Sequence, residues 1–215
     1  MTSIAKKFAM AASALFLLIF LLQHLSINLT SVFSADLFNE VSHFMGTNPL
    51  VQFVLQPILI FAVVYHFVMG FVLEYQNRKT RSTSYAMYKG SANSSWMSRN
   101  MIYSGGVILI FLGLHFYDFW VPEMDYKYIS GGPEDPTRYY EELQHRFHDV
   151  WRVVIYVAGF VFLGLHLLHG FQSAFQSIGA RGRFTPAIMT IGKVYSVVVS
   201  AGFIFIAIYH FLNHS

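Results

Sequence analysis

The chain has 215 residues, of which 55% are hydrophobic and only 12% charged, and it contains no cysteine. This composition is too apolar for an ordinary soluble domain, and the missing thiols exclude disulfides, thiolate clusters and thiolate haem ligation. The formal net charge of +3 reflects membrane topology, since no patch of basic and aromatic residues indicates nucleic-acid binding. The composition therefore predicts an integral membrane protein.

Five apolar runs are long enough to cross the ~30 Å hydrocarbon core of a bilayer as helices. In chain order they cover approximately residues 8–33, 50–76, 100–121, 150–176 and 187–212. Two lysines precede the first run, as in a secretory signal, but the run is too long and lacks a small-residue cleavage site. We predict an all-α integral membrane protein, with one domain over residues 1–215 and five transmembrane helices in a bundle.

Basic residues set the expected orientation, because cytoplasmic loops carry an excess of Lys and Arg. With a cytoplasmic N-terminus, ten basic residues belong to the inner segments and four to the outer ones. We therefore expect the N-terminus in the cytoplasm and the C-terminus outside. Residues 122–149 contain Gly-Gly-Pro and Asp-Pro turn signals before a short helical pattern, and predict a polar loop that caps the outer face.

Every predicted helix contains at least one histidine. An ionisable side chain inside a membrane is costly unless it faces the protein interior and has a partner, so each is a functional candidate. A single one could equally be a hydrogen-bonded interfacial residue, but several at matched depths are harder to explain in that way. These residues are His24, His66, His115, His166, His169 and His210.

Four of these histidines match in depth when each is counted from a basic residue at the inner boundary. His66 and His169 each lie 12 residues before an arginine, on inward-running helices, and share a level nearer the cytoplasm. His24 and His115 lie 17 and 16 residues after a basic residue, and share a level nearer the outside. His166 lies one helical turn further toward the outside than the level of His66. His169 is therefore the preferred partner of His66, and His166 is the alternative ligand.

Two imidazoles from facing helices at one depth are the axial ligands that a low-spin haem b requires. Zinc suits the pattern less, because it takes about four converging ligands and these histidines separate into two levels without carboxylates or thiolates. The sequence therefore predicts two bis-histidine haems b, one on His66 and His169 and one on His24 and His115.

Four stretches, together with the order and depth of their histidines, resemble a known family: FLLIFLLQHLSINLTSVF, YHFVMGFVLEYQNRKTRSTSY, LIFLGLHFYDFW and LGLHLLHGFQSAFQ. The chain resembles the cytochrome b membrane anchor of succinate dehydrogenases and fumarate reductases, of the single-subunit, five-helix, two-haem type. The resemblance implies a proximal haem on His66 and His169 and a distal haem on His24 and His115. It gives the fifth helix no ligand, so His210 is expected to be a packing or interfacial residue.

The resemblance implies electron transfer between a membrane quinone, menaquinone in the two-haem type, and a succinate or fumarate site on partner subunits of respiratory complex II. The implied partners are an iron–sulfur subunit and a flavoprotein subunit on the cytoplasmic side of a bacterial cytoplasmic membrane, in a dimer of heterotrimers. The chain has no flavin fingerprint, cluster-binding cysteines or nucleotide loop, so we do not expect it to oxidise succinate by itself.

For the quinone site, the candidates are Glu40 and His43, which could exchange protons, and Gln52 and Gln56, which could hydrogen-bond a quinone carbonyl. Taken alone, each of Glu40 and His43 is more simply explained as a solvated loop residue. Two other classes of protein stay open. A quinone-reactive cytochrome b subunit of another respiratory complex would carry its helix histidines in a different order and spacing. A haem-free ion transporter would show internal repeats or broken helices with intramembrane carboxylates, for which Asp118 at a helix end is poor evidence.

Overall fold

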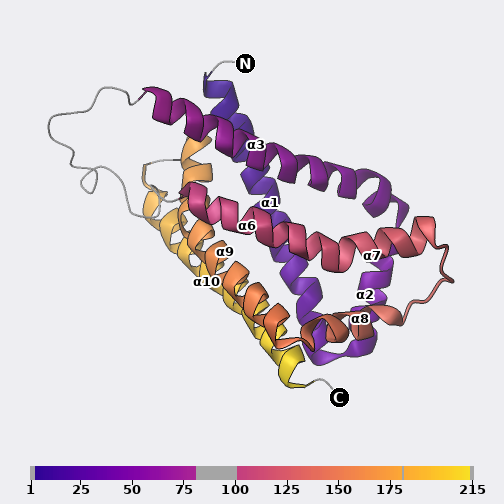
Figure 1. Ribbon diagram of the computed structural model, residues 1–215. Coiled ribbons are helices and arrows are strands. Elements are labelled where there is room, and N and C mark those ends of the chain that lie inside the picture. The colour runs from indigo at the N-terminus through magenta and orange to yellow at the C-terminus, as the bar shows by residue number, and fades with distance from the viewer. Residues whose placement is uncertain (1–2, 81–100, 181, 214–215) are drawn as a thin grey trace.

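The computed structural model describes residues 3–80, 101–180 and 182–213, and nearly all of them are helical. Five helices in these ranges are long and apolar enough to cross a membrane. They are Ile4–Phe33, Val51–Lys79, Met101–Ile129, Val150–Ser177 and Thr185–Leu212. The predicted all-α membrane bundle is confirmed, and the two termini lie at opposite ends of it (Figure 1). Which end faces the cytoplasm stays a prediction, and residues 81–99, which hold part of the basic excess behind it, lie outside the described ranges.

Two short helices lie beside the C-terminus, at one end of the bundle (Figure 1). We call this end the cap end, and the opposite end the N-terminal end. The long helices are α1 (Ser3–Phe33), α3 (Gln56–Thr80), α6 (Met101–His115), α9 (Val150–Ser177) and α10 (Thr185–Leu212), and the short ones are α2 (Ala35–Thr47) and α8 (Arg138–Phe147).

Local sequence explains where several of these helices begin and end. Ser34 and Asp149 adopt extended backbone conformations, and their side chains accept hydrogen bonds from backbone N–H groups in the first turns of α2 and α9, those of Leu37 and Trp151. α9 ends before Gly179, whose φ of +89° favours glycine because it has no side chain to clash. Pro186 in the first turn of α10 occupies a position where its missing N–H has no helical partner to lose.

The third span is longer than the sequence predicts. Instead of a loop from residue 122, the helix continues through a π-helical turn (Phe116–Trp120), α7 (Val121–Met124) and a second π-helical turn that ends at Ile129. Pro122 does not stop it, because it lies in the first turn of α7 after a shift of hydrogen-bond register in the π-helical turn. The predicted loop over 122–149 is therefore wrong in extent: only residues 130–137 and 148–149 separate helices there.

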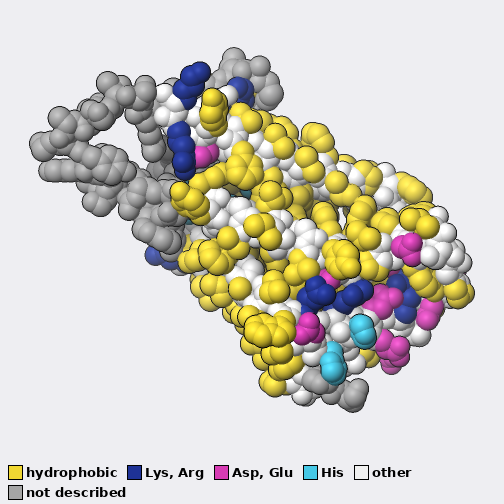
Figure 2. Space-filling model, viewed as in Figure 1, with side chains coloured by type: hydrophobic (Ala, Val, Ile, Leu, Met, Phe, Trp, Pro, Cys, Tyr) yellow, Lys and Arg dark blue, Asp and Glu magenta, His cyan; other side chains and the backbone are white. Residues whose placement is uncertain are grey.

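The core lies where α9 and α10 run along each other, with α1 and α6 packed against them. Glycine permits the close approach of α9 to α6, since a Cβ atom at Gly159 would lie 2.5 Å from the ring of Phe111. α3 packs mainly on α1, and side chains such as Phe61 are largely exposed. Figure 2 shows hydrophobic side chains along the flank of the bundle and charged ones gathered toward its ends. Such apolar flanks suit contact with lipid.

Candidate histidine sites

His24 of α1 and His115 of α6 lie against each other toward the cap end. Their ring centroids are 5.8 Å apart, with the ring planes at 80°. Aromatic rings surround them: Phe20 and Phe203 contact His24 at centroid distances of 5.4 and 5.6 Å, and Phe111 stacks on His115 at 6.1 Å. The structure thus brings together the two histidines that the sequence places at the outer level, and we call them the cap-end pair.

His66 of α3 and His166 of α9 form a second contact, with ring centroids 6.3 Å apart and planes at 71°. A serine from a neighbouring helix approaches each imidazole. Ser13 Oγ of α1 lies 3.3 Å from Nδ1 of His66, and Ser104 Oγ of α6 lies 3.2 Å from Nδ1 of His166. We call these histidines the N-terminal pair, because they lie closer to that end of the bundle than the cap-end pair.

The imidazole in contact with His66 is therefore that of His166, whereas the sequence favours His169. The count from arginines leads to a different match because the helix ends differ: α3 continues two residues past Arg78, whereas α9 ends four residues before Arg181. Counted from the helix ends, His66 lies 14 residues in, His166 lies 11 and His169 lies 8. At a rise of about 1.5 Å per residue, His166 is the closer match in depth.

His210 of α10 is completely buried at the cap end. Its Nε2 lies 2.8 Å from Ser31 Oγ of α1, and the ring of Tyr140 in α8 packs on it with centroids 5.6 Å apart. Ser31 donates its only hydroxyl proton to the carbonyl of Asn28, so its oxygen accepts the proton that His210 Nε2 donates. His210 thereby joins α10 to α1 by a hydrogen bond and to α8 by ring packing.

A buried carboxylate lies beside the cap-end pair. Asp118 follows His115 by three residues, and its side chain has no exposed surface. Tyr156 donates a hydrogen bond of 2.8 Å to Asp118 Oδ2, and Arg152 Nη1 lies 3.1 Å from Oδ1 as an ion pair without hydrogen-bond geometry. The Tyr156 ring also packs edge-on against His115, with centroids 6.2 Å apart. Sequence reasoning noted Asp118 but missed these partners, which lie more than 30 residues further along the chain.

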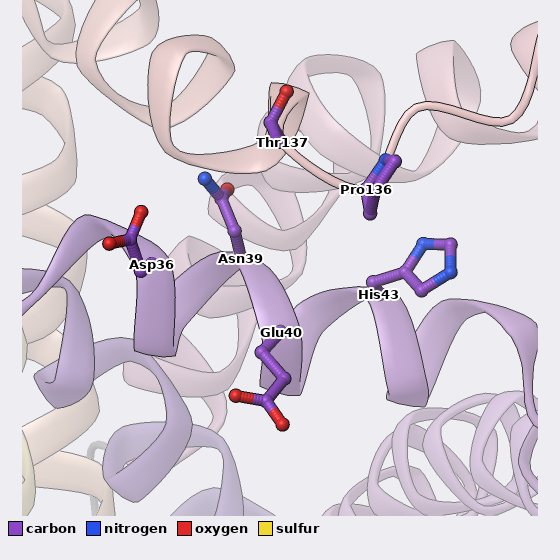
Figure 3. Close-up of a pocket in the computed structure, with 6 residues that line it drawn as sticks. All are labelled: Asp36, Asn39, Glu40, His43, Pro136 and Thr137. Carbon is purple, nitrogen blue, oxygen red and sulfur yellow. The ribbon is translucent and has the colours of Figure 1, made fainter.

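A pocket of about 280 Å³ opens at the cap end between α2 and the segment before α8 (Figure 3). Figure 3 shows Asn39 pointing toward Thr137, whereas Glu40 points away from that segment. Nε2 of His43 lies 3.2 Å from a carboxylate oxygen of Glu134. The lining residues are Asp36, Asn39, Glu40, His43, Pro136 and Thr137.

Two of the four quinone-site candidates, Glu40 and His43, thus share one pocket. The other two lie elsewhere. Gln52 donates to the carbonyl of Gly46 and accepts a hydrogen bond of 3.1 Å from Tyr128. Gln56 is the first residue of α3.

An ionic cluster ties the end of the third span to α8. Glu123 pairs with Lys127 at 2.5 Å and with Arg138, which also pairs with Glu142 at 2.6 Å and lies over the ring of Tyr126. Burial lowers the pKa of Arg138, but hydrogen bonds and charge from the two glutamates outweigh it and hold the pKa above its ordinary value. Arg138 is therefore charged at every physiological pH and anchors the cap.

Among the described residues, no group of three or more histidines or carboxylates could hold a metal ion. The four histidines in the two pairs instead place two imidazoles at each of two levels, and two imidazoles are the donor set of a bis-histidine haem. Comparison of the chain with protein-family models, curated proteins and solved structures finds no match.

Proposed function

We propose that the chain is a dihaem cytochrome b, the membrane anchor of a succinate:quinone oxidoreductase. The observation that carries the proposal is the presence of two imidazole pairs, each formed across two helices, at two levels of one bundle. A ring nitrogen lies about 2 Å from a metal that it ligates, so two imidazoles that ligated one metal from opposite sides would have centroids roughly 6 Å apart. The separations of 5.8 and 6.3 Å support that donor set.

The surroundings of the pairs also suit bis-histidine ligation. Nδ1 of His115 is buried without a hydrogen-bond partner among the described residues, and phenylalanine rings enclose the cap-end pair. A haem bound there would accept and release single electrons. The imidazoles would hold it at fixed depth, and the aromatic side chains would exclude water and so tune its potential. Two such sites at successive levels would carry electrons across the membrane.

The proposed quinone site is the pocket at the cap end. Reduction of a quinone takes up two protons, and its oxidation releases them, so titratable groups are required near the ring. Glu40 in the pocket, and His43 with its partner Glu134, are groups of that kind. Menaquinone is the quinone that the two-haem type leads us to expect.

At the N-terminal end we propose docking of the iron–sulfur subunit, with the flavoprotein subunit beyond it, in a dimer of heterotrimers. This places that end in the cytoplasm of a bacterium and the cap end outside. The described residues at the N-terminal end include Lys7, Arg78 and Lys79, which agrees with the positive-inside rule.

The test is reduction of the purified full-length chain by a soluble naphthoquinol, followed at the absorption band of reduced b-type haem. We expect the quinol to reduce the haem, and Glu40→Gln with His43→Gln to slow that reduction at least tenfold while dithionite still reduces the same amount. Haem that dithionite reduces but no quinol does would contradict the quinone role.

A further inference from the structure

The two histidine pairs differ in the hydrogen-bond partners of the ring nitrogen Nδ1. In the N-terminal pair, Nδ1 of His66 and Nδ1 of His166 each lie within 3.3 Å of a serine hydroxyl. These serines belong to α1 and α6, whereas the histidines belong to α3 and α9, so each contact joins two helices. The same arrangement thus occurs twice around one pair.

Counting protons gives the direction of both hydrogen bonds. Ser13 donates to the backbone carbonyl of Met10 at 2.8 Å, and Ser104 donates to that of Met101 at 2.9 Å. A hydroxyl has one proton, so each serine oxygen can only accept from the imidazole. The imidazole proton must therefore be on Nδ1, which leaves the lone pair of Nε2 free for a metal.

The cap-end pair lacks this arrangement. Nδ1 of His115 is buried and has no hydrogen-bond partner in the described structure. Nδ1 of His24 lies 3.3 Å from the side-chain amide nitrogen of Asn28, which is a donor and so cannot accept a proton from the ring. At His210 the serine holds Nε2 instead of Nδ1. Among these histidines, serine acceptors on Nδ1 occur only in the N-terminal pair.

We infer that Ser13 and Ser104 are positioning residues for one of the two haems, and that they lower its midpoint potential relative to an unsupported bis-histidine site. The inference rests on the proposed function. A hydrogen bond from Nδ1 to an acceptor fixes the tautomer and orientation of the ring and raises the basicity of Nε2. A more basic ligand stabilises ferric over ferrous iron. Since Ser104 supports His166, the inference also identifies His166 as the ligand from α9.

The test is a redox titration of the purified full-length chain and of its serine variants, with haem content measured in parallel. In Ser13→Ala and in Ser104→Ala, one haem transition should move to higher potential while the other stays. The threonine variants keep a hydroxyl and should restore the original potential. Ser26→Ala is the matched control. Ser26 of α1 also donates to a backbone carbonyl, that of Leu22 at 2.8 Å, but this hydrogen bond is exposed. The control should leave both transitions unchanged.

Two haems per chain with both potentials unmoved in the alanine variants would overturn the inference and leave the proposed function standing. A shift that Ser26→Ala reproduces would overturn it as well, because the effect would then be general to the bundle. A wild-type chain without haem would overturn the proposed function and this inference with it. The two serines lie on different helices, so either variant alone decides the matter if the other fails to fold.

Discussion

Asp118 is a carboxylate in a transmembrane span, and its side chain has no exposed surface. Two partners stabilise this buried carboxylate: the Tyr156 hydroxyl at 2.8 Å and Arg152 at 3.1 Å. We expect Asp118→Asn to lower the free energy of unfolding by about 1–3 kcal/mol, less than for a fully buried pair because Arg152 keeps partial access to water. Unfolding of the purified chain in detergent measures this change.

Glu74→Gln is the control for that variant. It removes the exposed pair between Glu74 and Arg78, at 2.6 Å on α3, and should leave the free energy of unfolding nearly unchanged because water screens the pair. Equal destabilisation by the two variants would show that the burial of Asp118 does not matter.

Sequence could identify the histidines as site residues, because an imidazole in an apolar helix needs a partner. It could also match His24 with His115 by depth. It could not choose between His166 and His169, because depth depends on where each helix ends. Nor could it predict the serine partners, since 53 and 62 residues separate them from their histidines along the chain.

At the level of the helices, the close packing of α6 on α9 depends on Gly159. A methyl group there would overlap the Phe111 ring, which also stacks on His115. We expect Gly159→Ala to destabilise the protein by about 1–3 kcal/mol, as overpacking of a core does. Thermal unfolding in detergent measures the effect.

Gly106→Ala is the matched substitution on α6, where an added Cβ meets no atom within 4 Å. It should be neutral or stabilising by up to about 1 kcal/mol, because alanine favours the helix. A loss of stability at Gly106 as large as that at Gly159 would contradict the packing explanation.

The positions of the spans could be predicted because about 20 apolar residues suffice to cross a bilayer. The extension of the third span to Ile129 could not. Pro122 and the charged residues after it are typical of a loop, and only the π-helical turn and the ion pairs of Glu123 explain why the helix continues.

For the whole molecule, the orientation in the membrane is the open prediction. The chain has no cysteine, so a single introduced one is the only thiol to label. With the cap end outside, Glu134→Cys should react with a membrane-impermeant maleimide in intact cells. Ser177→Cys, exposed at the opposite end of the bundle, should react only after the cells are opened. The reverse pattern would contradict the proposed orientation.

The central claim is that two imidazole pairs hold two haems. It is tested most directly by haem content per chain, measured as the pyridine haemochrome. We predict two b-type haems in the wild type and one in His24→Ala and in His166→Ala. His169→Ala and His210→Ala should keep both. A wild-type chain without haem, or a haem content that does not respond to His24 and His166, would contradict the account.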